Sequence, residues 1–372
     1  MMALAHEPRL AGGYLTIDLG ALRANYRTLQ EKLGDTECAG VVKADAYGLG
    51  IERVAPALAE EGCRKFFVAL PEEGVTLRRL LPDVEIFILS GLFQDCEELY
   101  VRDRLAPCLT SLEEIRRWSA AASRHGPLPC ILHLDSGISR LGLMEGPLRE
   151  LAENPDWLDG LEVEYLMSHL ACADSPENSY NEFQLEKLNT AISLLPPALR
   201  DTPVSFANSS GIFLGPEFQR DLARPGVALY GGNPTPGKPS PVRPVIHLQG
   251  KILQVHDVDS NIAVGYGASY RTAKNGRIAT VSVGYADGYF RAFGNSAFCA
   301  IQNRKIPVVG RVSMDMLTID VTDVEPELCK PGELVSLIGG AIDIDELADK
   351  AGTISYELLT SLGHRYYRRY ID

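Results

Sequence analysis

Short apolar runs alternate with amphipathic stretches over the first two thirds of the chain. Each run is rich in branched and aromatic side chains, which is typical of a buried strand. The stretches between the runs, such as 50–62 and 112–124, repeat apolar residues at the spacing of a helix. The strands expected from these runs are 38–44, 65–70, 85–91, 106–111, 130–137, 164–171, 203–209 and 223–231.

This alternation of strand and helix predicts parallel pairing, because parallel neighbours need a long crossover, usually a helix. About eight such units is the number that closes a (β/α)₈ TIM barrel. The sequence therefore predicts an α/β protein with an N-terminal (β/α)₈ barrel. A doubly wound sheet is the alternative.

The pattern changes after residues 231–244, a segment rich in proline and glycine that is typical of a linker. Beyond it, β-rich runs predominate and helical patterns close the chain. We expect a barrel domain over residues 14–235 and a mainly β domain over residues 236–372. The early segment 10–19 either joins the second domain as a strand or caps the bottom of the barrel.

Composition narrows the class of protein. The chain has 372 residues, of which 45% are hydrophobic and 23% charged, as in an ordinary soluble protein of about two domains. A net charge of −13 argues against a nucleic acid or an anionic membrane as partner, although a phosphorylated small ligand stays possible. Residues 1–10 contain no signal-peptide core, and no run has membrane-spanning length. The eight cysteines form no CxxC pair and indicate buried free thiols, so we expect a cytoplasmic protein.

One lysine stands where a strand is expected to end. The apolar run 39–42 leads to Lys43 and then into a glycine-containing turn at 47–50. An ammonium group loses hydration when it is buried, and burial lowers the pKa of a lysine. The neutral amine is then a nucleophile or a base, and a Schiff base with an aldehyde cofactor is a common use. A solvated lysine at the rim of the barrel is the structural alternative.

Other polar residues are expected at the same edge of the barrel, where active sites of such folds lie. Taken singly, each also has a structural interpretation, such as a hydrogen-bonded core histidine or a serine N-cap. The turn 208–211 offers hydroxyl and N–H groups suited to a phosphate. The residues at these strand ends are His133, Asp135, Arg140, His169, Asn208, Ser209, Ser210, Arg224, Gly226 and Tyr230.

Several motifs together resemble the alanine racemases, enzymes that use pyridoxal 5'-phosphate on a barrel-plus-β fold. The resemblance covers nearly the whole chain. It implies an isomerase that interconverts L-alanine and D-alanine, supplies D-alanine for peptidoglycan and forms a homodimer with shared active sites. The motifs are VVKADAYGLG (41–50), LMSHLACAD (166–174), FANSSG (206–211), LARPGVALYG (222–231), VGYGASY (264–270), SVGYADGY (282–289) and GRVSMDM (310–316).

The resemblance also implies a role for individual residues. Lys43 binds the cofactor and serves as the base for D-alanine, and Tyr266 is the base for L-alanine. A free tyrosine has a pKa near ~10, so Tyr266 needs cationic neighbours, which His169 and Arg224 can supply. The cofactor is bound by Lys43, Tyr47, His169, Asn208, Ser209, Arg224, Gly226 and Val227, and the substrate by Arg140, Tyr285, Met314 and Asp315. No metal is implied.

The chain departs from the family pattern at a few positions. Many members carry a carbamylated lysine where this chain has His133, and a histidine cannot become that anion at neutral pH. We therefore expect a bound anion such as chloride, or another side chain, beside Arg140. Ser313 stands where a cysteine is common, and whether His364 contacts the phosphate is open.

Other functions stay open at this stage. A serine racemase or one of broader specificity fits the same motifs. An amino-acid decarboxylase on this architecture usually has a carboxylate at the pyridine nitrogen, so Arg224 argues against it. A non-catalytic carrier of pyridoxal phosphate is disfavoured by the second domain with Tyr266. The sequence leaves a biosynthetic and a catabolic role equally open.

Overall fold

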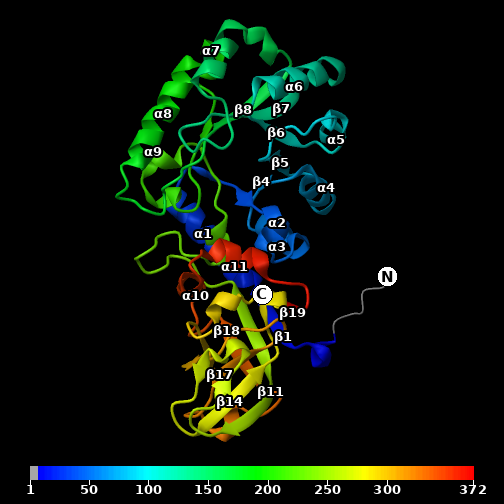
Figure 1. Cartoon of the computed structure of the whole chain (residues 1–372). Helices are drawn as coiled ribbons and strands as arrows, with labels where there is room; N and C mark the ends of the chain where they lie inside the picture. Colours follow the sequence, from blue (N-terminus) through cyan, green and yellow to red (C-terminus); the bar gives the residue numbers. More distant parts are fainter. Residues whose placement is uncertain (1–6) are drawn as a thin grey trace. The chain divides into compact units, whose positions relative to one another are not determined.

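The computed structural model describes residues 7–372 and divides them into two compact units (Figure 1). The first unit joins the described residues up to Ala21 with Tyr230–Gly232 and Pro244–Asp372, and the second comprises Leu22–Leu229 and Asn233–Arg243. Part of the segment 1–10, where we expect no signal peptide, lies outside the described residues. Within residues 7–372, no helix combines the length and apolar character that crossing a membrane requires.

Seven parallel strands in chain order form the central sheet of the second unit, with helices between them (Figure 1). Unbroken chain order excludes the doubly wound alternative, whose strand order reverses. The α/β class with a TIM-like N-terminal domain is therefore confirmed. The strands are β3 (Gly40–Val41), β4 (Lys65–Val68), β5 (Glu85–Ile88), β6 (Ala106–Leu109), β7 (Leu128–His133), β8 (Leu161–Met167) and β9 (Val204–Ser205).

The eighth position of the ring is taken by a short strand pair. Strand β10 (Leu222–Ala223) pairs in parallel with β2 (Glu37–Cys38), which directly precedes β3. On the other side, the amide of Arg224 donates to the carbonyl of Ala207, just beyond β9, at 2.8 Å. The predicted strand 223–231 is too long, because Val227–Tyr230 form the 3₁₀ helix η5.

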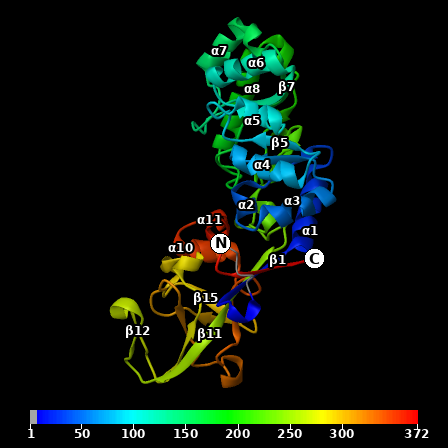
Figure 2. The ribbon, with the colours of Figure 1, turned by 90° about the vertical axis from the view of Figure 1, so that its right-hand side faces the viewer.

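Amphipathic helices cover the outer side of this sheet, as Figures 1 and 2 show. In α6, Ser111 caps the N-terminus by accepting from the amide of Glu114, and the apolar face buries Trp118. The helices are α1 (Leu19–Leu33), α3 (Ile51–Glu60), α4 (Pro71–Leu80), α5 (Glu97–Arg102), α6 (Leu112–His125), α7 (Glu145–Glu153), α8 (Tyr180–Leu194) and α9 (Pro216–Gln219), with 3₁₀ turns η2 (Pro155–Leu158), η3 (Pro197–Leu199) and η4 (Gly211–Phe213).

Aromatic rings fill the interior enclosed by these strands. Phe67 and Phe87 stack with ring centres 4.8 Å apart, and Phe87 meets the edge of Tyr165 at 6.3 Å. The guanidinium of Arg224 lies over Phe67, 5.8 Å from the ring centre. Since the interior is packed, the strand ends are where a barrel of this kind binds its ligand.

The first unit is mainly β, as the fold class predicts. Its eight-stranded sheet includes the N-terminal strand β1 (Gly13–Asp18), which pairs antiparallel with β11 (Ile246–Val258) and parallel with β19 (Tyr367–Ile371). Figure 2 shows the length of β11. The other strands of the sheet are β14 (Gly276–Val281), β15 (Phe298–Ile301), β16 (Arg304–Pro307), β17 (Leu317–Asp320) and β18 (Leu334–Ile338).

Smaller elements complete this unit. Strands β12 (Ala263–Val264) and β13 (Tyr270–Arg271) form a separate antiparallel pair, and two helices, α10 (Ile344–Ala351) and α11 (Ser355–Ser361), precede β19. The 3₁₀ turns are η1 (Pro8–Leu10), η6 (Tyr266–Ala268), η7 (Tyr285–Asp287), η8 (Arg291–Phe293) and η9 (Pro326–Leu328).

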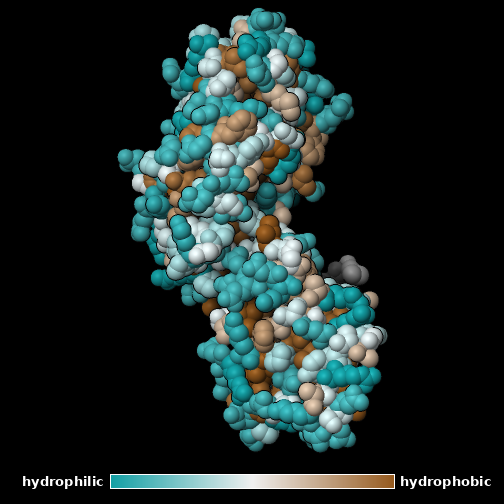
Figure 3. Space-filling model, turned by 60° about the vertical axis from the view of Figure 1, so that its left-hand side comes forward, coloured by the Kyte–Doolittle hydropathy of each residue, from teal (hydrophilic) through white to brown (hydrophobic). Residues whose placement is uncertain are grey.

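The surface and the cysteines agree with the composition. The face drawn in Figure 3 is mainly hydrophilic, with apolar residues in separate groups. All eight cysteines lie within the described residues and are free thiols, as predicted, and six of them are buried.

Candidate active site

Lys43 begins a short turn, α2 (Lys43–Tyr47), at the end of the first barrel strand, where the sequence predicts it. The next four residues, 44–47, all have φ between 53° and 56°, so the turn is left-handed. This conformation costs an L-residue about 1–2 kcal/mol, hence about 4–8 kcal/mol for four, before compensating contacts. Such strain is typical of functional sites and persists only where neighbouring structure holds it.

Local hydrogen bonds account for part of that support. The amide of Gly48 donates to the carbonyl of Ala44 at 2.7 Å. The carboxylate of Asp45 accepts from the amide of Ile51, also at 2.7 Å, at the start of α3. Burial lowers the pKa of Lys43, Arg140 and Arg224 lower it further, and Glu73 opposes them. The amine is thereby favoured as a base.

Arg224 and His169 lie together near the lysine. The buried guanidinium of Arg224 donates to the hydroxyl of Ser205 at 2.5 Å and to the carbonyl of Ser168 at 2.6 Å. Its Nη2 lies 3.5 Å from Nδ1 of His169. Burial lowers the pKa of Arg224 to about 10, so it stays charged at neutral pH. Burial, with Arg224, Arg140 and Lys43, lowers the pKa of His169 to about 3, which keeps its ring neutral.

A small cradle is formed by Ser209, Tyr47 and Gly226. The Ser209 hydroxyl accepts from the amides of Gly226 and Ala228, at 2.9 and 3.2 Å, which leaves its hydrogen for a ligand. A Cβ on Gly226 would lie 2.1 Å from the Tyr47 hydroxyl, so only glycine leaves that space. Asn208 shapes the turn, because its side chain donates to Leu170 O and accepts from Gly211 N. Val227 is buried at the start of η5.

The surroundings of His133 and Arg140 differ in part from expectation. His133 is only 5% exposed, and neither ring nitrogen has a hydrogen-bond partner among the described residues. Burial first, and then Arg224, lower its pKa to about 4. Arg140 is exposed, and its side chain makes no hydrogen bond or ion pair within residues 7–372. Of the two partners predicted for Arg140, an anion or another side chain, the described residues supply no side chain, and the prediction stays a prediction.

The remaining predicted residues belong to the first unit. Tyr266 is 72% exposed at the start of η6 and lines a pocket of about 410 Å³. The same pocket is lined by Ser313 and Met316, which flank Met314 and Asp315. The amide of Tyr285 donates to the carbonyl of Ser313 at 3.0 Å, so its loop lies against this segment. His364 is exposed in this unit, whereas the cradle of Ser209, Tyr47 and Gly226 belongs to the second unit. Whether His364 contacts the phosphate therefore stays open.

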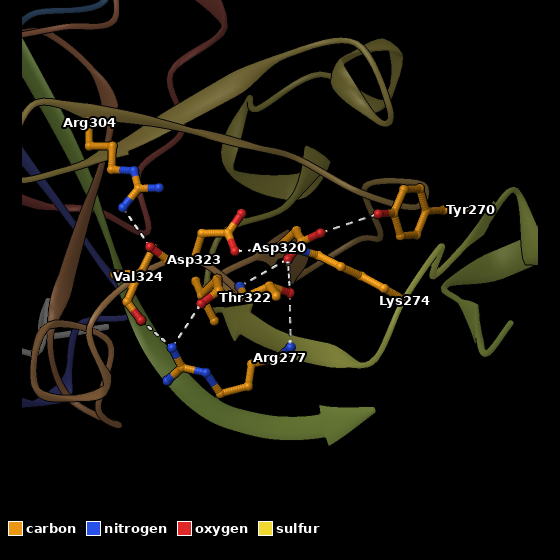
Figure 4. A network of polar contacts seen from close by, with 9 residues as sticks. Tyr270, Lys274, Arg277, Arg304, Asp320, Thr322, Asp323 and Val324 are labelled. Carbon is orange, nitrogen blue, oxygen red and sulfur yellow. Dashed lines mark hydrogen bonds and ion pairs between the residues drawn. The ribbon is translucent and has the colours of Figure 1, made fainter. Parts of the chain in front are cut away.

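A polar network supports the loop that carries Tyr266 (Figure 4). The Tyr270 hydroxyl, at the end of that loop, donates to Asp320 at 3.3 Å. Asp320 also accepts from the amide of Thr322, whose hydroxyl accepts from the amide of Arg277. On another side, Asn295 donates to the hydroxyl of Ser269 at 3.1 Å. The loop is thus held at its C-terminal end by two neighbouring segments.

Two arginines of this unit were not predicted from the sequence. Arg311 lines the Tyr266 pocket, and its guanidinium would lie 2.9 Å from a Cβ on Gly267. Arg365 binds Asp315 at 2.7 Å and the buried Asp287 at 2.6 Å. Arg311 lies inside the motif 310–316, close to Met314, so the sequence contained a signal that Arg311 belongs to the site. Arg365 follows the last helix and has no motif around it.

The donor set of the second unit suits an aldehyde cofactor with a phosphate group. Two hydroxyls and a glycine that leaves space suit a phosphate, a lysine of lowered pKa suits the aldehyde, and a buried arginine suits a ring nitrogen. Within the described residues, no group of three or more histidine, cysteine or acidic side chains could hold a metal ion.

Comparison with known proteins gives consistent matches over the whole chain. Residues 17–234 match the family "Alanine racemase, N-terminal domain", and residues 245–370 match "Alanine racemase, C-terminal domain". The alanine racemase of Rhodospirillum rubrum is 48% identical over 99% of this chain and 98% of its own. A catabolic alanine racemase of Mesorhizobium japonicum is 45% identical over 97% of this chain and 94% of its own. A crystal structure of alanine racemase from Bartonella henselae, with covalently bound pyridoxal phosphate, has a TM-score of 0.92 and 40% identity, covering 97% of this chain and all of that one.

Proposed function

The chain belongs to the alanine racemase family, and we propose that Lys43 and Tyr266 are the two bases of its reaction. It is an isomerase that interconverts L-alanine and D-alanine and depends on pyridoxal phosphate. The residue assignment rests on the position and the pKa of Lys43. Its amine lies at a barrel strand end and has a lowered pKa. The same unit contains the cradle of Ser209, Tyr47 and Gly226.

When bound, pyridoxal phosphate supplies an aldehyde for the substrate amine and a ring that draws electrons from the α-carbon. Ser209 and Tyr47 would hold its phosphate, with Val227 and the Asn208 turn packed around it. Lys43 would hold its aldehyde, and His169 would pack against the ring. Arg224 would face the ring nitrogen and, being charged, would leave that nitrogen unprotonated.

The chain's two bases act on opposite faces of the α-carbon. Nζ of Lys43 takes the proton as a neutral amine, or returns it as an ammonium, on the face used by D-alanine. On the face used by L-alanine, the oxygen of Tyr266 takes it as a phenolate or returns it as a hydroxyl. Lowering the pKa of Lys43 raises the fraction of neutral amine that can accept a proton. Arg140 would bind the substrate carboxylate, Met314 and Asp315 would contact the substrate beside it, and Tyr285 would line its path. An anion beside Arg140 and His133 belongs to the same proposal.

We propose further that two copies of the chain build each site. Tyr266 is 72% exposed, with Met314 and Met316 exposed near it, and a base needs shielding from water that a second copy would provide. The product D-alanine would serve peptidoglycan synthesis. Eight free thiols favour a reducing compartment, and hence the cytoplasm.

The direct test is to incubate the purified protein with pyridoxal phosphate and L-alanine and to assay for D-alanine, with L-serine in parallel. We expect D-alanine to form, and its absence would contradict the function.

Lys43→Ala should remove both activity and the visible absorbance of the lysine-bound cofactor. Retention of that absorbance would contradict the assignment of Lys43.

Tyr266→Phe separates the two bases. We expect exchange of the α-proton of L-alanine with deuterated solvent to fall by about 10²–10⁴-fold, because one proton-transfer group is lost. Exchange from D-alanine, which starts at Lys43, should fall far less. Equal loss for both enantiomers would contradict the two-base scheme.

A further inference from the structure

Glu73 lies in the first turn of α4, yet its carboxylate reaches the turn that begins with Lys43. Its Oε1 accepts from the amide of Ala44 at 2.6 Å. Its Oε2 accepts from the amides of Ala69 and Leu70 at 2.7 and 3.0 Å. One carboxylate thus joins the loop after β3 to the loop after β4.

The bond to Ala44 is the one that bears on the lysine. Ala44 directly follows Lys43 and is the first left-handed residue of the turn, with φ of 54°. Its amide donates to Glu73 and to no backbone carbonyl. The bond therefore holds the peptide group between Lys43 and Ala44 in place. The residue that holds it, Glu73, lies outside the strained turn.

We propose that Glu73 is a positioning residue, which holds the left-handed turn and so fixes the Lys43 amine where the reaction needs it. This inference rests on the proposed role of Lys43. A strained turn of four residues relaxes unless neighbouring structure opposes it, and Glu73 supplies a tie from a separate barrel unit.

Charge gives Glu73 a second effect on the same amine. Arg140 and Arg224 lower the pKa of Lys43, and Glu73 is the acidic group that raises it. A neutral side chain at position 73 should therefore lower the pKa of Lys43. A purely structural support would leave that pKa unchanged.

Glu73→Gln is the sharpest variant, because glutamine has the same shape but only one acceptor oxygen. It can accept from the amide of Ala44 or from those of Ala69 and Leu70 but not both, since its NH₂ group would face an N–H. Glu72→Gln is the matched control. Glu72 is the exposed neighbour on the same helix, carries the same charge, and has no side-chain hydrogen bond or ion pair among residues 7–372. Glu73→Asp keeps the charge but is one methylene too short to join both loops.

Two readouts on the cofactor-free protein accompany the holoenzyme assay. Hydrogen exchange of the amides in 44–50 should speed up about tenfold or more in Glu73→Gln and Glu73→Asp, and stay unchanged in Glu72→Gln. The pKa of Lys43, measured by ¹³C-methyl NMR after reductive methylation, should fall in Glu73→Gln only. In the holoenzyme, kcat for alanine should fall about tenfold or more in both Glu73 variants, with KM changed less.

The outcomes separate this inference from the proposed function. If Glu73→Gln and Glu73→Asp match Glu72→Gln in exchange and in kcat, Glu73 is no positioning residue. If the wild type forms no D-alanine, the proposed function itself fails. Should Glu73→Gln not fold, Glu73→Asp with wild-type exchange and kcat overturns the inference on its own.

Discussion

At the scale of single residues, basic groups outnumber acidic groups at the carboxyl ends of the barrel strands. His133 and His169 have pKa values of about 4 and 3, so both rings are neutral at physiological pH. Positive charge is left to Arg140, Arg224 and Lys43. This residual charge suits anionic ligands such as a phosphate or a carboxylate.

Replacing His133 should make the protein less sensitive to acid. The pKa of His133 is about 4 when folded, against 6.5 when exposed, so the unfolded chain binds the proton more tightly. Its stabilising contribution is therefore complete above pH 6.5 and is lost as pH falls towards 4, by about 2 kcal/mol between pH 8 and pH 5. Urea unfolding of wild type and His133→Leu at these two pH values measures this. Equal losses in both proteins would contradict the prediction.

The motifs predict some site residues better than others. The place of Ser209 and Gly226 in the cradle could be expected, because hydroxyls and glycine at a strand end are a local signal. Glu73 could not be predicted, since it acts by reaching the turn after Lys43, which only the folded chain brings near. For Arg140, where the sequence predicts an anion or another side chain as partner, residues 7–372 supply no side chain, and the prediction stays a prediction.

At the scale of elements, the sequence predicts the central strands of the barrel but not the left-handed backbone conformations. The runs 65–70 and 85–91 have consecutive buried residues at their centres, 66–68 and 86–88, so their apolar composition marks them. The left-handed turn 44–47 contains no glycine, and its conformation depends on Glu73 and Asp45. The predicted strand 223–231 stops at Ala223 because Pro225 has no N–H, and the next amides donate to Ser209.

Arg365 offers a test at this scale, because it ties the end of the chain to two loops. Its loss leaves the buried carboxylate of Asp287, 5% exposed, without a cation and releases Asp315. Arg365→Ala should lower the free energy of unfolding by about 1–3 kcal/mol and raise KM for alanine. Adding Asp287→Asn should recover part of the stability, since an amide needs no counter-ion. An unchanged unfolding midpoint in Arg365→Ala would count against the tie.

At the scale of the whole molecule, the candidate site residues divide between two units. The proposed cofactor residues belong to the second unit, and Tyr266, Tyr285, Met314 and Asp315 to the first. If Lys43 and Tyr266 are the two bases, as we propose, bases in separate units would allow a site to be assembled from two copies. The sequence could suggest this only through the family resemblance, because composition carries no signal of assembly.

Mixing two inactive variants tests the shared site. In a hybrid of Lys43→Ala and Tyr266→Phe chains, one site would contain both intact bases and the other neither. Random exchange would then restore about a quarter of wild-type activity, as half the dimers are hybrids with one good site. Sites built within single chains would give no recovery, provided that native mass spectrometry shows hybrids. Each variant alone serves as the control.

The pairing of β1 with β19 also sets the timing of folding on the ribosome. Thr16 lies opposite Arg369, 353 residues later, and the two side chains are bonded. At about 5–20 residues per second, β1 waits roughly 20–70 s after synthesis for this neighbour. The barrel sequence is complete before that time ends, so the second unit can form while β1 still exposes an unpaired edge. The nascent chain therefore carries a strand open to unintended pairing until its final residues emerge.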